Sequence, residues 1–210
     1  GSASPYSSFL RDVETAVDRP RRDSKSDPRD TSGRRAFDEA LNQLKERTPG
    51  FSKDLPQRLN FWGEEILAFD GEWYHAFNAF RPRKMKNNVV DDEMLRLRYP
   101  LTKPRGEIDG VELTPQQNHN FIKAYNDIKA PNPSADNKRM NMRETLEWQV
   151  TKSRAYARAR SDEERMGMLR RTRDFFVNAA RGAMQVTGTK YYDADLSTRV
   201  NVLKNAQRGR

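Results

Sequence analysis

The sequence contains no cysteine, only two histidines and no long apolar run. The absence of cysteine excludes disulfides, thiol catalysis and metal sites with cysteine ligands, and it fits a reducing compartment without requiring one. No apolar run approaches the roughly 18 residues that a membrane-spanning helix needs, and no signal peptide is recognisable. We therefore expect no membrane-spanning segment in this sequence.

Motifs of catalysis are missing as well. The sequence has no GxSxG, P-loop, GxGxxG or HExxH pattern, and His75 and His119 are too isolated to predict a metal site. Glu64-Glu65 and Asp91-Asp92-Glu93 are adjacent carboxylates, which point in different directions on a helix and so cannot flank one scissile bond. We expect no enzyme activity, no catalytic residue, no bound metal and no cofactor.

Apolar residues are scarce for a chain of 210 residues, with 35% hydrophobic and 33% charged residues and a mean hydropathy of -1.04. The length suffices for a sizeable core. The composition instead predicts an extended arrangement, or a core that a partner completes. The absence of an initiator Met indicates a fragment, and Gly1-Ser2 is either a remnant of an expression tag or the point at which a longer chain was cut.

The net charge of +9 has two interpretations. A basic chain attracts nucleic acid or another anionic surface. However, 30 acidic residues are mixed among 39 basic ones, which is typical of a solvated surface of mixed charge. No RRM, zinc-finger or helix-turn-helix signature is present, so the sequence leaves open whether its basic residues contact DNA or acidic protein.

Helical patterns recur along the chain and predict a mainly α fold, an extended arrangement of roughly five or six helices with long irregular connections rich in Pro, Gly and aromatic residues and no substantial sheet. Thr114-Pro115-Gln116-Gln117 and Ser161-Asp162-Glu163-Glu164 both read as capping boxes, which start helices. Further helices are expected at 36–47, 89–99, from Met142 to about Arg160, and from about Asp195.

The predicted domain organisation follows from these patterns. Residues 1–18 form a short helix that must dock on something, because isolated helices of about three turns are marginal in water. Residues 19–35 lack any large apolar side chain and are expected to be a flexible linker. Residues 36–210 form a helical domain, in which 36–110 hold a helix and an irregular aromatic stretch and 111–210 form a helical bundle.

The irregular stretch runs from Arg47 to Pro82. The chain has ten Phe and seven Tyr residues, and six of these lie in the stretch, together with two of the three Trp residues. The Pro and Gly residues between them rule out a long helix or an uninterrupted strand. Because so many aromatic side chains need burial, we expect the stretch to be held against the chain's own helices or a partner, with Trp62 and Gly63 as the anchor.

This stretch resembles a family of phage proteins. Its residues Pro49-Gly50-Phe51-Ser52, Leu55-Pro56, Arg58, Asn60 and Trp62-Gly63-Glu64 are similar to the pattern PG(L/F)S followed by LPxRxNxWGE, found near the C-terminus of very large tailed-phage proteins. These are internal virion or ejection proteins and tape-measure-like polyproteins. The resemblance covers roughly residues 5–130 and continues through Pro5 to Arg11, Val90-Asp91, Leu95-Arg96-Leu97 and Leu113 to Gln117.

The resemblance implies a non-enzymatic structural segment of a virion or tail protein, located in the phage particle and delivered to the host with the DNA during ejection. The implied partners are other segments or copies of the same large protein and the portal or tail proteins. The alternative is a basic helical module that binds packaged or injected DNA.

Candidate binding residues follow from the two hypotheses. Aromatic and apolar residues of the irregular stretch are the candidates for binding a partner protein: Phe51, Leu55, Pro56, Phe61, Trp62, Trp73 and Tyr74. Basic residues at and just after the end of the stretch, and in the helix that starts at Ser161, are the candidates for contacting phosphate: Arg81, Arg83, Lys84, Lys86, Arg170, Arg171 and Arg173.

Overall fold

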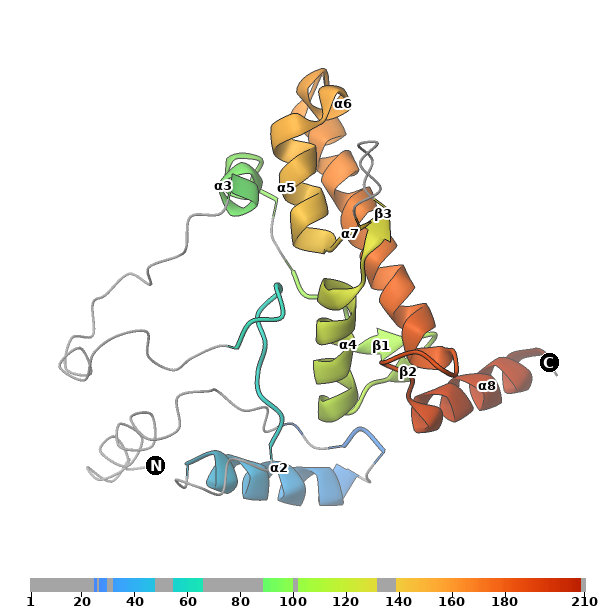
Figure 1. The fold of residues 1–210 in the computed structure, drawn as a ribbon. Helices are drawn as coiled ribbons and strands as arrows, with labels where there is room; N and C mark the ends of the chain where they lie inside the picture. The colour runs from blue at the N-terminus through green and yellow to red at the C-terminus, as the bar shows by residue number, and fades with distance from the viewer. Residues whose placement is uncertain are drawn as a thin grey trace, which may run out of the picture. The chain divides into compact units, whose positions relative to one another are not determined.

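The computed structural model describes residues 25, 27–29, 32–47, 55–65, 89–99, 102–131 and 139–208. It confirms the mainly α fold class (Figure 1). The helices are α2 (Ser32–Arg47), α3 (Val89–Arg96), α4 (Pro115–Asp127), α5 (Met142–Lys152), α6 (Arg154–Ala157), α7 (Asp162–Gln185) and α8 (Ala194–Arg208). Within the described ranges, the strands form two short antiparallel hairpins, β1 (Glu107–Ile108) with β2 (Val111–Glu112) and β3 (Ala130–Pro131) with β4 (Arg139–Met140).

The predicted domain boundaries are tested only in part. The expected docking helix at 1–18 lies outside the described residues. The same is true of residues 66–88, which hold the second part of the irregular stretch and the basic run that follows it. The linker prediction for 19–35 needs a correction at its end, because α2 begins at Ser32 and not at Ala36. Its first turn contains Arg34 and Arg35, which are good helix formers and extend the helix beyond its apolar pattern.

The described residues divide into two compact units. The first unit holds α2, the segment up to Asn60, Glu64 with Glu65, and Thr114–His119. Leu59 forms an isolated antiparallel bridge with Glu65, and Leu55 and Leu59 are buried. The predicted capping box at Thr114 is present, since the Gln117 amide donates to Thr114 Oγ1 at 3.2 Å and the Thr114 amide donates to Gln117 Oε1 at 3.1 Å.

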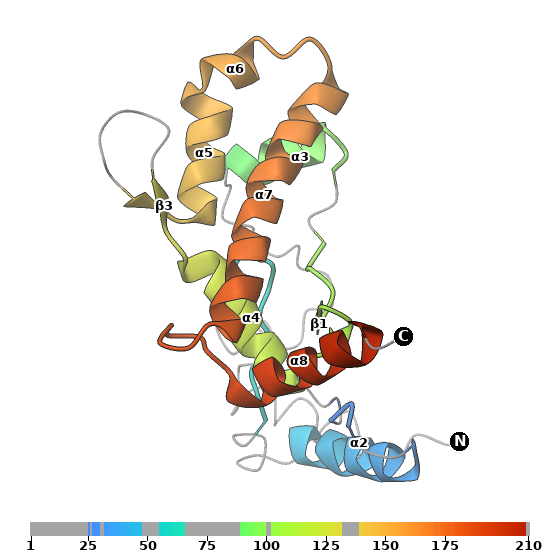
Figure 2. The ribbon, with the colours of Figure 1, turned by 90° about the vertical axis from the view of Figure 1, so that its right-hand side faces the viewer.

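The second unit holds Phe61–Gly63, the described residues from Val89 to Leu113, and those from Asn120 onward. Its core is formed by α5 packed between α3 and α7, with α8 against α7 and β2, and α5 and α7 run side by side in both views (Figures 1 and 2). The largest side chains of this unit with almost no exposed area come from α3, β1, α4, α5, α7 and α8: Val90, Ile108, Phe121, Tyr125, Met142, Leu146, Leu169, Phe176, Met184, Leu196 and Val200.

The predicted helix from Met142 to Arg160 is broken at Ser153. The Ser153 backbone is extended, with ψ 117°, so it ends α5 and caps the short α6, whose Tyr156 amide donates to Ser153 Oγ at 3.3 Å. Ser161 then caps α7 by accepting from the Glu164 amide at 3.1 Å. The Glu164 carboxylate accepts from the Arg160 amide and not from Ser161, so this capping box is displaced by one residue.

Residues with positive φ end α3 and form the turn of the β1–β2 hairpin in the second unit. Arg98, with φ 52°, follows α3 in a Schellman motif, in which the Tyr99 amide donates to the Met94 carbonyl and the Arg98 amide to the Leu95 carbonyl. This motif ends α3 at Arg96, three residues before the predicted end. Asp109 (φ 49°) and Gly110 (φ 81°) form the turn between β1 and β2, the pair of positive φ values that a type I′ hairpin requires.

Candidate interaction surface

Trp62 lies at the centre of an aromatic cluster in the second unit. Its indole Nε1 donates to Asp91 Oδ1 of α3 at 3.1 Å, the Arg143 guanidinium of α5 lies 4.8 Å from the ring centroid, and Phe61 packs edge-on at 5.0 Å. A hydrogen bond, a cation–π contact and an aromatic pair thus meet on one half-buried ring. These contacts agree with the role of anchor expected for Trp62.

Phe61 is held more deeply than Trp62. Its side chain is buried and lies 6.0 Å from the Tyr125 ring, and its carbonyl accepts from Tyr125 Oη and Asn126 Nδ2, each at 3.1 Å. Burial raises the pKa of Tyr125, so its hydroxyl stays protonated as a donor. Gly63 has φ 72°, and a Cβ there would lie 3.1 Å from Asn126 Nδ2, so both the backbone and the close approach favour glycine.

The burial of four of the predicted partner-binding residues can be compared with their expected role. Leu55 and Phe61 are buried within the chain and are therefore core residues of their units and not surface contacts, which corrects that part of the prediction. Pro56 and Trp62 are half-buried. Phe51, Trp73 and Tyr74 lie outside the described residues, so their predicted role remains a prediction.

The predicted phosphate-contacting residues of α7 have different surroundings. Arg170 lies over the Tyr99 ring at 5.8 Å, and Arg173 forms an ion pair with Asp174 at 2.8 Å. Arg171 is exposed on the same helix. The structure thus separates an engaged Arg173 from the exposed Arg170 and Arg171, and Arg81, Arg83, Lys84 and Lys86 belong to the part of the chain that it does not describe.

Arg171 borders an open depression on α7 of about 400 Å³. Its walls come from α7, α5 and β3: Ala130, Pro131, Thr145, Arg171, Thr172, Phe175 and Phe176. Phe176 points into the core, whereas the side chain of Phe175 is 54% exposed. The depression therefore combines an apolar ring and wall with one cationic side chain, and aromatic and Arg side chains are enriched in protein contact surfaces.

A charged cluster links α3 to α6 and α7. Arg96 pairs with Glu93 at 2.7 Å and with Asp162 at 3.1 Å, Arg165 also pairs with Asp162, and the Tyr156 hydroxyl donates to Glu93 Oε1 at 2.7 Å. The hydrogen bond from Arg96 holds the pKa of Glu93 below its ordinary value, and the same arginine lowers the pKa of Asp162. Every carboxylate here is engaged by a cation, so the cluster is a structural link between elements.

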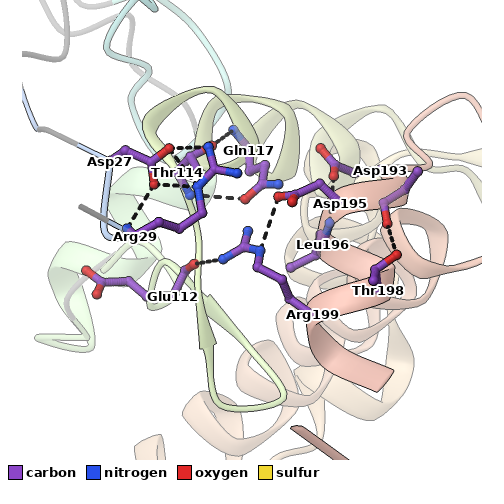
Figure 3. A network of polar contacts seen from close by, with 11 residues as sticks. Asp27, Arg29, Glu112, Thr114, Gln117, Asp193, Asp195, Leu196, Thr198 and Arg199 are labelled. Atoms are coloured by element: carbon purple, nitrogen blue, oxygen red, sulfur yellow. Dashed lines mark hydrogen bonds and ion pairs between the residues drawn. The ribbon is translucent and has the colours of Figure 1, made fainter. Parts of the chain in front are cut away.

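A second polar network joins α8 to the β1–β2 hairpin. Figure 3 shows Arg199 between the carboxylate of Asp195, at 3.1 Å, and the backbone carbonyl of Glu112, also at 3.1 Å. On the other side of the hairpin, Lys204 pairs with Asp109 at 2.8 Å, and its hydrogen bond lowers the pKa of Asp109. The basic residues of α8 at 199 and 204 are thus used within the unit.

His119 makes a contact with the backbone of the segment that precedes Asn60. Its Nδ1 lies 2.9 Å from the Gln57 carbonyl, which can only accept, so this nitrogen carries the proton and donates. Among the described residues there is no group of three or more His, Cys, Asp or Glu side chains placed to hold a metal ion. None of the helices in the described ranges is both long and apolar enough to cross a membrane.

Comparison of the chain with protein-family models, curated proteins and solved structures finds no match.

Sequence reasoning missed three residues of these surfaces. Asp91 and Arg143 hold Trp62 from positions 29 and 81 residues away in sequence, and no local pattern indicates such long-range contacts. Phe175 was also missed, although a signal existed. Phe176 shares helical spacing with the apolar residues Leu169 and Ala180, and the helical rotation turns the neighbouring Phe175 about 100° away from that apolar face.

Proposed function

We propose that this chain is a non-enzymatic structural segment of a phage internal virion or tail protein and that it acts by binding other proteins. The proposal rests on the resemblance of residues 49–64 to large tailed-phage proteins, together with one observation on α2. Phe37 and Leu41, one turn apart on this helix, are 64% and 37% exposed. An amphipathic helix gains most of its stability in a protein by burying such a face.

The apolar face of α2 supports protein binding in energetic terms. Fully burying an exposed Phe or Leu side chain gives about 1.5–3 kcal/mol, and part of that gain is still available at Phe37 and, to a smaller extent, at Leu41. Aromatic side chains are enriched at the centres of protein interfaces. In the part of the chain that the structure describes, no group of three or more His, Cys, Asp or Glu side chains is placed to hold a catalytic metal ion.

The location proposed for the chain is tested on purified phage particles. Particles of the phage that encodes this sequence are digested and analysed by mass spectrometry, with a non-structural protein of the same phage as the control. Peptides from residues 36–210 are expected at a stoichiometry typical of virion proteins. Their absence from particles that retain portal and tail proteins would contradict the proposal.

The binding activity is tested with purified portal and tail proteins from the same particle. Sedimentation velocity of the mixtures is expected to show a complex that Phe37→Ser with Leu41→Ser weakens. Because both side chains are exposed, the circular dichroism spectrum should stay unchanged. A paired substitution at exposed polar positions of α2, Glu39→Ser with Gln43→Ser, is the control. Turnover of peptidoglycan or nucleic acid by the purified chain would overturn the non-enzymatic proposal.

A second function is favoured by Arg170 and Arg171, which are exposed on α7 in a chain of net charge +9. They suit a contact with the phosphates of DNA. An electrophoretic mobility shift should then weaken steeply between about 50 and 200 mM salt, because phosphate binding releases counterions. Arg171→Gln should lower the slope of this dependence by about one. Arg173→Gln, whose side chain is paired with Asp174, is the matched control.

A further inference from the structure

The outer face of α7 carries a continuous stripe that the core does not use. Arg171, Phe175, Asn178, Gly182 and Val186 follow one another at spacings of three or four residues, which places them on one side of the helix. All five are exposed, Val186 by 58%. In Figure 2, α7 runs down the face turned toward the viewer.

Gly182 lies in the last turn of α7 without a packing reason inside the chain. Glycine is among the least favourable residues within a helix. A close neighbour could require it, yet a Cβ built on Gly182 would meet no atom within 4 Å. The backbone of α7 is therefore open to a close approach from outside at this position.

Phe175 supplies the complementary feature. Its ring is anchored on one side by an edge-on contact with Phe176 at 5.2 Å, and it remains 54% exposed on the other. It precedes Gly182 by seven residues, or about 10 Å along the helix axis. One helix face thus presents a projecting aromatic ring and an open backbone position two turns apart.

We propose that a second copy of this chain docks on α7 in antiparallel orientation, with Phe175 of each copy seated over Gly182 of the other. A two-fold axis that passes between Asn178 and Ala179 brings both pairs together at once. This is the self-complementary contact of an isologous interface, in which residue i meets residue j and j meets i. The inference deepens the proposed function, on which it rests, by naming the partner and the surface.

Charge complementarity supports the same register. Asp174 and Arg181 lie on the same flank of the stripe, and a perpendicular two-fold axis places matching flanks side by side. Each Arg181, which donates to Asn178 Oδ1 of its own chain at 3.1 Å, then approaches Asp174 of the second copy. Asp174 already pairs with Arg173 in its own chain, but its side chain is 46% exposed and can accept a further partner.

Arg171 also gains a favourable position in this register. It falls opposite Val186 of the second copy, at the C-terminal end of that copy's α7. Helix C-termini carry a partial negative charge that a cation stabilises. The last turn of α7 has no basic residue of its own, so Arg171 supplies from the second copy the charge that this helix end lacks.

Cysteine cross-linking tests the register, because the natural chain has no cysteine. Asn178→Cys lies beside the two-fold axis and is expected to form a disulfide-linked dimer on mild oxidation. Arg171→Cys alone is expected not to, because the two sulfur-bearing positions would be about 22 Å apart along the axis, beyond disulfide range. Combining Arg171→Cys with Val186→Cys should restore cross-linking. Efficient cross-linking of Arg171→Cys alone would indicate a parallel pair and overturn the register.

Sedimentation equilibrium of the full chain over a concentration series tests the contact itself. The natural chain is expected to dimerise, and Phe175→Asp and Gly182→Leu should each weaken the dimer at least tenfold. Circular dichroism should show both variants folded, because both positions face outward. Val202→Asp removes an equally exposed apolar side chain, 64% exposed on α8, and should leave the dimer intact.

The outcomes separate this inference from the proposed function. A monomer at every concentration, or a dimer that Phe175→Asp does not weaken, would overturn the α7 contact, whereas binding to portal or tail proteins through α2 would still support the proposed function. Absence of the chain from phage particles would contradict the proposed function and leave the dimer measurement unaffected.

Discussion

Trp62 holds residues Phe61–Gly63 on the second unit. Its indole donates a hydrogen bond to Asp91 of α3, and its ring contacts Arg143 of α5. Because the ring is half-buried, we expect Trp62→Ala to lower the free energy of unfolding by about 2 kcal/mol, less than the roughly 3 kcal/mol or more of a fully buried aromatic ring. Urea unfolding followed by circular dichroism measures the change.

Trp62→Phe is the matched variant, because it keeps an aromatic ring beneath Arg143 and removes only the indole donor to Asp91. Its expected cost is about 1 kcal/mol, the usual contribution of one hydrogen bond. If Trp62→Phe and Trp62→Ala lowered the free energy of unfolding equally, the hydrogen bond to Asp91 alone would account for the anchoring. No loss in either variant would show that Trp62 does not anchor this segment.

Arg98 closes α3 with a left-handed backbone, which glycine adopts without strain. Arg98→Gly should therefore stabilise the protein by about 0.5–1 kcal/mol, an unusual sign for a substitution by glycine. Thermal unfolding of the two proteins provides the measurement. Arg105→Gly, at an exposed position without positive φ, is the control and should be neutral or destabilising.

Local patterns in the sequence explain which residues could be predicted. The Thr114 box was predictable because its partners lie three residues apart, and Asp109-Gly110 carried the signal of a tight hairpin, although no turn was predicted there. The contact between Trp62 and Asp91 could not be predicted, because it depends on where α3 packs. Likewise, the helix arginines could be recognised as basic, but only the structure distinguishes the paired Arg173 from the exposed Arg171.

At the scale of elements, α3 is joined to α6 through Glu93 and to α7 through Arg96. The hydrogen bond from Arg96 keeps the pKa of Glu93 below its ordinary value of 4.5, so the folded protein binds this proton less tightly than the unfolded chain. The stabilisation is therefore present above about pH 4.5 and is lost as the pH falls through the lowered pKa.

Glu93→Gln tests this link. The difference in unfolding free energy between the natural protein and the variant should be largest near neutral pH and should shrink as the pH falls below about 4.5. Urea unfolding at pH 7, 5 and 3.5 measures it. Glu107→Gln, at the exposed end of β1, is the control. A difference that stays constant or grows toward low pH would contradict the assigned role of Glu93.

Element positions were better predicted than element ends. The helix at 36–47 was recognised from a helical pattern, and the helices that start near Thr114 and Ser161 from their capping boxes. The break at Ser153 was missed, since the residues around it are good helix formers and the break depends on how α5, α6 and α7 fold back on one another. The end of α3 was missed because arginine rarely occupies the left-handed position that closes a Schellman motif.

At the scale of the whole molecule, self-association through α7 and DNA binding should respond to salt in opposite directions. Two copies of a chain with net charge +9 repel each other, and salt screens this repulsion. Raising the salt concentration from about 50 to 300 mM should strengthen self-association through α7 and weaken DNA binding. Sedimentation equilibrium and mobility shifts in the same buffers compare the two. Self-association that falls with salt as steeply as DNA binding would favour ionic contacts over the apolar stripe.

The end of α7 has a consequence for how this part of the molecule opens. Its final carbonyls at Gly182, Ala183, Met184 and Gln185 accept in turn from the Val186 amide, Thr189 Oγ1, the Asp193 amide and Ser197 Oγ. Three of these four donors come from the turn between the helices or from the first turn of α8. Fraying of α8 therefore removes donor partners from α7, and the two helix ends should open as one cooperative unit.

In hydrogen exchange, the amides of Val186, Asp193 and Ser197 should share one protection level. Thr189→Val should lower it for all three together.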